Sequence, residues 1–477
     1  MTSILFTAFE AAPFVKTGGL GDVAGSLPYY IASDNFDIRM ILPKLSAIPE
    51  EYSSKMEFLC DFNVQLGWRN QYCGLFKLVR NGLTIYFLDS EYYFKRPKVY
   101  GEFDDGERVA FFSKAVLEAI PHLEGFEPDI IHANDWHTAL VPVFLRELYM
   151  RKKIYKKIRT VFTIHNLKFQ GNYDPFMIGD VLGLHKTPAA GQLLSNGRLN
   201  YLKGACMYSD IVTTVSPSYA REICTDYYGE GLNWLFAQRA DSLVGILNGI
   251  DYKAFDPASD PAIAAGYSAE NPAGKAKCKA ALQKELGLPV KAKTPLFCLV
   301  SRLTEQKGMD LVNYILPEMA RRDMQFAVLG VGDYKYEEAL SYYAKACPDK
   351  IAACLKFNED LSHRFFAGGD VLLMPSRFEP CGLSQMMAMR YGTLPLVRET
   401  GGLRDSVVPY NRFTSEGTGF SFANFNAHEL LGTIDLAIDV FKNNKSNWQT
   451  MQNAAMNADF SWTASAKKYQ RMYLDLL

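Results

Sequence analysis

Short runs of apolar residues alternate with segments of helical spacing along almost the whole chain. This alternation is the sequence pattern of a parallel sheet covered by helices on both faces, and it predicts an α/β fold. In the first half of the chain the predicted strands are Ile4–Phe9, Ile38–Leu42, Thr84–Leu88, Ile130–Ala133, Arg159–Ile164, Ile211–Val215 and Leu243–Leu247.

The second half of the chain repeats the pattern after a break. A segment rich in Ala, Pro and Ser runs from Asn248 to about Gly274 and predicts a domain boundary. We expect one domain over residues 1–248, a second over 249–460 and a helical tail over 461–477. The strands predicted in the second domain are Leu296–Val300, Gln325–Leu329, Ala352–Phe357, Val371–Met374 and Leu394–Val397.

Polar residues follow several of the predicted strands in the first domain. A single polar residue at a strand end is ordinary, because polarity returns wherever a strand leaves the core. A repeated pattern has more weight, since ligands of open α/β sheets bind beyond the carboxyl ends of the strands. We therefore expect one wall of a binding cleft to include Glu10, Asp89, Asp135, His165, Asn166 and Asn248.

Length and charge narrow the classes of function. A chain of 477 residues is too long for a single core. With 51 basic and 52 acidic residues, the net charge of -1 argues against nucleic acid or a membrane surface as a partner. No apolar run reaches the roughly 18 residues of a membrane span, and the N-terminal segment resembles a first strand rather than a signal peptide.

The cysteines favour a reducing compartment. Nine are present, none forms a C-x-x-C pair, and residues such as Cys298 and Cys354 lie within apolar runs. They are typical of buried thiols rather than disulfides or zinc ligands. We therefore predict a cytoplasmic protein.

The stretch Ser376–Ser384 is the strongest candidate for the chemistry. It follows a predicted buried strand, contains Glu379, and turns at Gly382 into a segment of good helix formers. A carboxylate beside a helix start, which attracts anions, suits a ligand with a polyol at one end and phosphate at the other. The alternative from this stretch alone is structural, with Glu379 capping the helix and Arg377 pairing with it at the surface.

Two other loops carry candidate binding groups. The loop Lys16–Ala24 contains G-x-G-x-x-A between a strand and a helix, but the next strand ends in Pro43 and Lys44 where a dinucleotide site needs an acid. What remains is a glycine loop that a ligand can approach closely. In the second loop, Arg302 and Lys307 are spaced to straddle a diphosphate, although they could also be solvated surface charges.

The sequence predicts no metal and no cofactor. It has no D-x-D pair, and the set His132–His137 would point its side chains to alternate faces of a strand rather than toward one ion. Arg302, Lys307 and a helix start would supply the positive charge that a departing diphosphate needs.

Together these motifs resemble the bacterial glycogen synthase and plant starch synthase family over the whole chain. The resemblance implies a GT-B architecture, in which two Rossmann-like domains face each other across a cleft. It also implies retaining transfer of glucose from ADP-glucose to the non-reducing 4-hydroxyl of an α-1,4-glucan. The segments that carry it are Lys16–Asp22, His132–His137, Thr163–Asn166, Val215–Pro217, Leu247–Asp251, Ser301–Arg302, Gln306–Gly308, Pro375–Leu383 and Thr400–Leu403.

The resemblance also implies roles for individual residues. Arg302 and Lys307 would neutralise the diphosphate, Glu379 would serve the sugar or its anomeric carbon, and His165 and Asp135 would bind glucose hydroxyls. Tyr93 would touch the acceptor, as would Asp135, and residues after about Ser461 would return to the first domain. The remaining donor contacts would be Lys16, Gly18, Gly19, Asp22, Asn248, Phe357, Cys381, Gly382, Leu383, Thr400 and Gly401.

Two departures from the family pattern affect details. Phe357 stands where the family often has tyrosine, which keeps base stacking and loses a hydroxyl contact. The segment from Tyr100 to Arg108 is shorter than usual, which affects the acceptor contacts.

The sequence shows no convincing second carboxylate for double displacement, so we favour front-face attack, with domain closure excluding water. A non-catalytic glucan-binding protein, a transferase that uses UDP-glucose, and a sucrose synthase-like enzyme remain alternatives. Oligomeric state is not predicted.

Overall fold

The computed structural model describes residues 1–356 and 358–477. The chain divides into two compact units, each with its own sheet and core. The N-terminal unit comprises Met1–Val215, Ala220–Gly249 and Trp462–Leu477, and the C-terminal unit comprises Ser216–Tyr219 and Ile250–Ser461. The predicted strand Ala352–Phe357 runs into Phe357, which lies outside the described residues.

The N-terminal unit is built on a nine-stranded sheet of order β12-β11-β7-β6-β1-β2-β5-β4-β3 in the described residues. Pairings are parallel except those of β3 with β4 and β4 with β5, which are antiparallel. The strands are β1 (Thr2–Thr7), β2 (Phe36–Pro43), β3 (Glu57–Leu66), β4 (Arg69–Arg80), β5 (Leu83–Asp89), β6 (Ile130–Asn134), β7 (Arg159–Ile164), β11 (Ile211–Thr214) and β12 (Leu243–Gly245).

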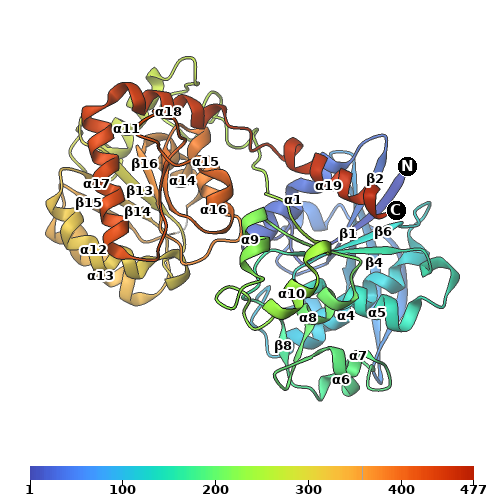
Figure 1. Cartoon of the computed structure of the whole chain (residues 1–477). Helices are drawn as coiled ribbons and strands as arrows, with labels where there is room; N and C mark the ends of the chain where they lie inside the picture. The colour runs from blue at the N-terminus through green and yellow to red at the C-terminus, as the bar shows by residue number, and fades with distance from the viewer. Residues whose placement is uncertain (357) are drawn as a thin grey trace. The chain divides into compact units, whose positions relative to one another are not determined.

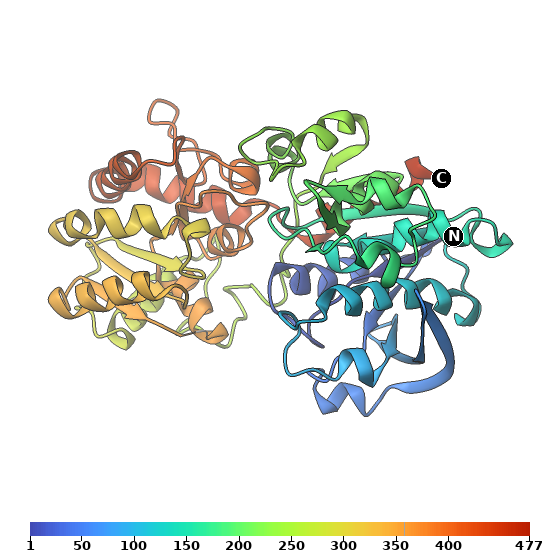
Figure 2. The same ribbon diagram turned by 90° about the horizontal axis from the view of Figure 1, so that it is seen from below.

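The central strands of this sheet are buried on both faces. Ile4, Leu5 and Phe6 of β1 are consecutive residues and are all fully buried. Burial of both alternating faces explains why these strands are continuous apolar runs in the sequence. Helices lie on the two sides of the sheet (Figures 1 and 2), and they are α1 (Gly19–Ile31), α4 (Asp105–Ala119), α5 (Leu140–Phe144), α8 (Tyr201–Tyr208), α10 (Asn233–Gln238) and α19 (Trp462–Leu476).

The antiparallel hairpin β3–β4 was not predicted from the sequence. It extends the sheet at one edge and exposes aromatic residues, including Phe58 and Tyr72. A second, three-stranded sheet of order β8-β10-β9 was also not predicted, and it contains β8 (Asn172–Tyr173), β9 (Leu194–Ser195) and β10 (Arg198–Asn200).

The C-terminal helix belongs to the N-terminal unit. Helix α19 packs on α1, where the Gln470 amide donates to the Ile31 carbonyl at 3.0 Å. The Tyr473 hydroxyl lies 2.6 Å from Nδ1 of His132, and Ser465 donates to the carbonyl of Leu247 at 2.7 Å. His132, in β6, is therefore a core residue that anchors this helix.

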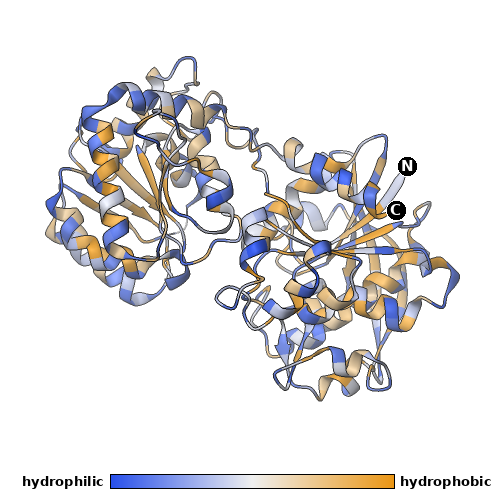
Figure 3. Cartoon of the chain, viewed as in Figure 1, coloured by the Kyte–Doolittle hydropathy of each residue, from blue (hydrophilic) through white to orange (hydrophobic). Residues whose placement is uncertain are grey.

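The C-terminal unit contains a parallel sheet of order β15-β14-β13-β16-β17-β18. Its strands, orange in the hydropathy colouring of Figure 3, lie between helices. The strands are β13 (Leu296–Val300), β14 (Gln325–Leu329), β15 (Ile351–Cys354), β16 (Val371–Met374), β17 (Leu394–Arg398) and β18 (Phe420–Phe422). The helices are α11 (Ala273–Glu285), α12 (Met309–Arg321), α13 (Tyr334–Ala346), α14 (Glu359–Gly368), α15 (Ser384–Arg390), α16 (Gly401–Ser406), α17 (Ala427–Asn443) and α18 (Lys445–Asn457).

Candidate active site

The strand order of the C-terminal unit reverses between β13 and β16. From β13 the chain proceeds through β14 to β15 at one edge, and then returns to β16 on the other side of β13. The loops that leave the carboxyl ends of β13 and β16 therefore diverge at a topological switch point, where open α/β sheets bind ligands. These loops, residues 301–308 and 375–383, contain the predicted cations and Glu379.

Glu379 and Lys307 meet directly at this switch point. Nζ of Lys307 lies 2.6 Å from Oε2 of Glu379, and Ser376 donates its hydroxyl to the same oxygen at 3.0 Å. The Glu379 and Ser376 side chains are buried, whereas that of Lys307 is 18% exposed. The carboxylate is thus held by two donors, and the ammonium retains access to solvent.

Close backbone contacts fix the two loops. Gly308 has φ +75°, and a Cβ atom on it would lie 2.0 Å from the carbonyl oxygen of Pro375. Gly401 has φ +45°, and its Cβ would lie 2.0 Å from the carbonyl oxygen of Glu379. Only glycine allows both the left-handed conformation and this approach. These glycines bring the loop after β13 and the start of α16 against the Glu379 segment.

The other residues of this unit that were predicted to bind the sugar-nucleotide donor differ in solvent exposure. Arg302 is exposed and makes no ion pair with any residue in the described part of the chain. Cys381 and Thr400 are buried, and Gly382 and Leu383 are half-buried. The prediction for Phe357 lies outside the described residues.

In the N-terminal unit, a buried carboxylate organises the glycine loop. Oε2 of Glu10 accepts hydrogen bonds from the backbone N–H and the hydroxyl of Thr17, at 2.7 and 2.6 Å, and Oε1 accepts from the N–H of Gly21 at 3.2 Å. Burial raises the pKa of the Glu10 carboxyl, although these hydrogen bonds oppose the increase. At the surface of the loop, Lys16 forms an ion pair with Asp22 at 2.7 Å.

Gly18 and Gly19 are not required by the protein itself. A Cβ atom on either would meet no heavy atom within 4 Å, and Gly18 has an extended backbone with φ -167° that any residue can adopt. Space is therefore left beside the backbone at the start of α1. The predicted close approach of a ligand would account for it.

Asp135 follows β6 in an uncommon conformation. Its φ of +56° combines with a ψ of 177°, a backbone conformation that is essentially restricted to glycine. Its N–H donates to the Thr163 carbonyl at 2.9 Å, and its Oδ1 accepts from the N–H of His165 at 2.8 Å. Burial raises the pKa of Asp135 to about 7. The carboxyl can thus change protonation near neutral pH.

His165 is held as a neutral ring. Burial lowers its pKa to about 3, and its Nε2 lies 2.9 Å from Oδ1 of Asn134. Because the Asn134 amide nitrogen donates to the Thr7 carbonyl at 3.1 Å, its oxygen is the acceptor for His165. The proton is therefore assigned to Nε2, which leaves Nδ1 of His165 as an acceptor.

Asn248 and Tyr93 were both predicted to contact a ligand, and the structure gives their side chains different surroundings. Asn248 is buried, and its Oδ1 has no hydrogen-bond partner among residues 1–356 and 358–477, so a polar ligand group could satisfy it. The prediction that Tyr93 contacts the acceptor is not supported, because its side chain is fully buried and its hydroxyl donates to Glu107 at 2.7 Å. The adjacent Tyr92 is 59% exposed, whereas the side chain of Tyr93 belongs to the core.

The sequence placed three further residues in the candidate segments or the cleft wall without giving them these roles. Ser376 orients Glu379, Glu10 organises the glycine loop, and Asn134 fixes the His165 ring. Glu10 had a visible signal, since a carboxylate follows the first strand six residues before Lys16. Ser376 and Asn134 lie within the segments Pro375–Leu383 and His132–His137, and their spacing gives no sign that they orient a neighbouring side chain.

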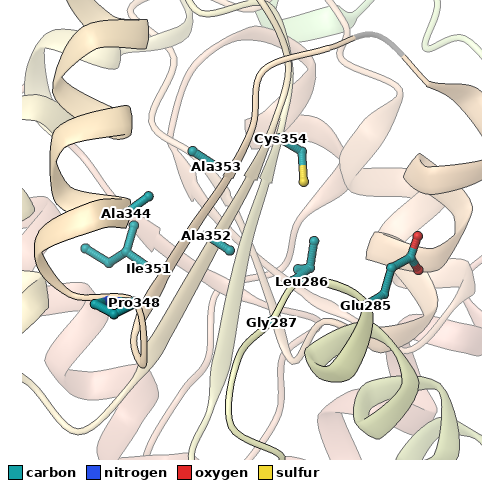
Figure 4. Close-up of a pocket in the computed structure, with 9 residues that line it drawn as sticks. All are labelled: Glu285, Leu286, Gly287, Ala344, Pro348, Ile351, Ala352, Ala353 and Cys354. Carbon is teal, nitrogen blue, oxygen red and sulfur yellow. The ribbon is translucent and has the colours of Figure 1, made fainter.

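A hollow of about 300 Å³ lies elsewhere, at the β15 edge of the C-terminal sheet (Figure 4). Of the predicted site residues that the structure describes, none lines it; its walls are Glu285, Leu286, Gly287, Ala344, Pro348, Ile351, Ala352, Ala353 and Cys354. No group of three or more His, Cys, Asp or Glu side chains within residues 1–356 and 358–477 is arranged to hold a metal ion. Across the same residues, every helix is too short or too polar to cross a membrane.

Comparisons with known proteins agree over the whole chain. Residues 3–238 match the model of the starch synthase catalytic domain, and residues 284–454 match that of glycosyl transferases group 1. A glycogen synthase of Lachnospira eligens is 49% identical, with 100% of each chain covered. One from Geobacillus thermodenitrificans is 48% identical over 99% of this chain and 98% of its own.

A solved structure extends the likeness to three dimensions. The catalytic domain of starch synthase IV from Arabidopsis thaliana, bound to ADP and acarbose, has a TM-score of 0.89 and 32% identity. The alignment covers 100% of this chain and 99% of the plant domain.

Proposed function

The chain belongs to the glycogen synthase family, and from that premise we propose that it transfers glucose from ADP-glucose to the non-reducing 4-hydroxyl of an α-1,4-glucan, with retention at the anomeric carbon. Its fold is the predicted GT-B fold of two α/β domains. The starch synthase relative binds ADP and acarbose, an α-glucan analogue in shape, which supports a nucleotide-sugar donor and a glucan acceptor.

The observation that carries the proposal is the contact between Lys307 and Glu379 at the switch point, with exposed Arg302 on the same loop as Lys307. A diphosphate that binds there meets a planar guanidinium and an ammonium, which can spread the charge that develops as it leaves. Glu379, freed from Lys307 by the arriving phosphates, would face the sugar. There it can accept a hydrogen bond from a sugar hydroxyl or stabilise positive charge at the anomeric carbon.

The proposed chemistry is a front-face substitution. The bond between C1 of glucose and the β-phosphate oxygen breaks, and a bond from C1 to the acceptor O4 forms on the same face. The proton of the acceptor hydroxyl passes to the leaving phosphate, so ADP is released and the glucan grows by one residue. Arg302 and Lys307 act on the leaving group, and neither needs to lose a proton.

The N-terminal unit would supply the contacts to sugar hydroxyls. We assign Nδ1 of the neutral His165 and the Asp135 carboxyl to glucose hydroxyls. Nδ1 of His165 is a fixed acceptor, and the buried Asp135 carboxyl accepts a hydrogen bond from the backbone N–H of His165. Lys16, Asp22 and the open backbone at Gly18 and Gly19 are assigned to the donor.

We also place the protein in the cytoplasm. The nine cysteines are thiols rather than disulfides, which fits a reducing compartment. Fractionation of the source cells with antibody detection tests this location separately from the activity.

The enzyme assay compares donors side by side. Purified protein is incubated with glycogen and radiolabelled ADP-glucose or UDP-glucose, with and without chelator, and label in precipitated polymer is counted. We expect incorporation from ADP-glucose, an equal rate with chelator, and a lower rate from UDP-glucose. Absence of incorporation from both donors would overturn the proposal, and a preference for UDP-glucose would overturn the choice of nucleotide.

A further inference from the structure

A tryptophan at the tip of the β3–β4 hairpin is largely exposed. Leu66 pairs with Arg69 across the hairpin, so Gly67 and Trp68 form a two-residue turn. The Trp68 side chain is 75% exposed. Two-residue turns favour small or polar residues such as Asn and Gly, and an indole gains nothing there from burial. A role in binding would explain its presence.

The indole is held in one orientation. Its Nε1–H donates to Oδ1 of Asp180 at 2.9 Å, and the Arg69 guanidinium lies 4.6 Å from the ring centroid. Arg69 in turn donates to the carbonyl oxygen and to Oδ2 of Asp180, at 2.8 and 2.9 Å. Arg69 covers one face of the ring, and the exposed area leaves the other face open to solvent.

The backbone beneath the ring is also fixed. Gly67 has φ +58°, and a Cβ atom on it would lie 2.2 Å from the carbonyl oxygen of Asp180. The hairpin tip is therefore in direct contact with the segment that contains α6 (Met177–Asp180). A ring that is ordered before binding loses little conformational entropy when a ligand stacks on it.

A second exposed ring lies on the same segment. Phe176 is 74% exposed, and its carbonyl accepts from the N–H of Asp180 at 3.1 Å. This i to i+4 hydrogen bond places Phe176 and Asp180 on neighbouring turns of one face. We name Trp68, Arg69, Phe176 and Asp180 the hairpin platform.

We propose that the hairpin platform binds an α-1,4-glucan chain at a site separate from the transfer site. This inference rests on the proposed function for the identity of the polymer. Aromatic faces pack against the apolar C–H faces of glucose rings, while Asp180 and Arg69 offer an acceptor and donors for the hydroxyls.

The charges of the platform favour a neutral ligand. Hydrogen bonds from Trp68 and Arg69 lower the pKa of Asp180. This carboxyl therefore stays ionised and can accept hydrogen bonds from hydroxyl groups. Arg69 also pairs with Glu107 at 3.0 Å, which leaves the cluster without excess positive charge. A nucleic acid or another polyanion is therefore a poor occupant.

Aromatic side chains continue from the platform toward the proposed acceptor residues in the same unit. Tyr173 lies three residues before Phe176, and its ring centroid is 6.2 Å from that of Trp136. Trp136 directly follows Asp135. A glucan held at Trp68 and Phe176 would therefore find further stacking surface in the direction of Asp135.

The test measures glucan binding without transfer. Native electrophoresis in gels that contain increasing glycogen, with no sugar nucleotide, gives an apparent Kd from the retardation. We expect Trp68→Ala and Phe176→Ala each to raise this Kd by about 10-fold, equivalent to about 1.4 kcal/mol. Trp68→Phe keeps a ring and should stay within about threefold of the wild type. The matched control is Phe413→Ala, which removes an 85%-exposed ring from the C-terminal unit and should leave the Kd unchanged.

Thermal unfolding of each variant shows whether the fold is kept, and Phe176→Ala tests the platform independently if Trp68→Ala unfolds. Wild-type retardation in both alanine variants, or no retardation of the wild type, would overturn the platform. Retardation without incorporation of glucose from either donor would overturn the proposed function and leave the platform intact.

Discussion

The ammonium of Lys307 lies 2.6 Å from the carboxylate of Glu379, and the two residues come from loops that follow the adjacent strands β13 and β16. In this state each group neutralises the other. A donor diphosphate would compete with Glu379 for Lys307, so substrate binding and release of the carboxylate would be linked.

Replacement of Lys307 by alanine should lower turnover by about 10²- to 10³-fold, because one cation that stabilises the leaving diphosphate is lost, worth ~3–4 kcal/mol. Initial rates of ADP release with glycogen and saturating ADP-glucose measure the effect. Thermal unfolding is recorded in parallel, since the buried Glu379 loses its partner.

Arg321→Ala is the control for loss of a cation from the same unit. Its side chain is 75% exposed and pairs with Glu318 on the surface. We expect this variant to keep wild-type turnover. A loss of less than about threefold in Lys307→Ala would remove Lys307 from the mechanism.

Ser376→Ala should lower kcat about 10-fold while changing the KM for ADP-glucose less than about twofold. The Ser376 hydroxyl donates to Glu379 at 3.0 Å in a buried setting, and a hydrogen bond to a charged group is worth roughly 1.5–3 kcal/mol. Steady-state kinetics separate the two constants. Ser54→Ala, at the exposed position that follows the short helix α2 (Glu50–Ser53), serves as control. An unchanged kcat in Ser376→Ala would show that Glu379 needs no such orientation.

Ionisation of Asp135 should reduce stability as pH rises. Its pKa is raised to about 7 from an ordinary value of 3.8, so the fold favours the protonated form. That contribution is complete below about pH 4 and is lost as pH rises through about 7. Asp135→Asn cannot ionise and should not lose it. The difference in free energy of unfolding between wild type and variant should therefore shift by on the order of 4 kcal/mol across this range.

Urea unfolding of both proteins at pH 4, 5.5, 7 and 8 measures this difference. Asparagine has nearly the same shape as aspartate and keeps the acceptor for the His165 N–H, so it meets the same backbone strain and the fold is retained. The Glu10 carboxyl titrates in both proteins, and because its charge helps to raise the pKa of Asp135, the difference between them includes this coupling. A difference that is constant with pH would contradict the assignment.

Gly18→Ala should leave stability nearly unchanged and raise the KM for ADP-glucose at least about 10-fold, or about 1.4 kcal/mol. The added methyl meets no protein atom within 4 Å, so any effect reports the approach of a ligand. Differential scanning calorimetry and kinetics together make the test.

Substitutions at two other glycines are the controls for Gly18→Ala. Gly432→Ala, in α17 with open space around it, should be neutral or slightly stabilising and leave KM unchanged. Gly25→Ala, whose Cβ would lie 2.5 Å from the Ala12 carbonyl oxygen, should destabilise the fold. A Gly18→Ala enzyme with wild-type KM would exclude the start of α1 from the donor site.

The sequence predicted the parallel core well. The structure confirms the predicted bounds of Arg159–Ile164, Leu296–Val300, Gln325–Leu329 and Val371–Met374. These strands are almost entirely buried, so their apolar runs are continuous and easy to recognise.

The hairpin β3–β4 escaped prediction for the opposite reason. It lies at a sheet edge, and its exposed face mixes charged residues with aromatics such as Phe58 and Tyr72. The buried alternation of Val64 with Leu66, and of Cys73 with Leu75, is too short to stand out in that setting.

The site was predicted as a set of loops rather than as contacts. The sequence indicated that the loops with Lys307 and Glu379 share one side of a sheet, yet it could not give their direct contact. That contact depends on β16 pairing with β13, which brings together two residues that are 72 positions apart in the chain. Tyr93 shows a second limit, since its predicted role came from the resemblance alone and nothing in the sequence indicated that its side chain is buried.

Helix α19 has a consequence for biosynthesis. The N-terminal unit includes Trp462–Leu477, where Tyr473 and Ser465 bond to residues of its sheet region. Its native packing therefore waits until this helix has emerged from the ribosome, after the entire C-terminal unit has been translated. The C-terminal unit, whose residues are nearly all contiguous, is free to fold first, which inverts the usual order of cotranslational folding.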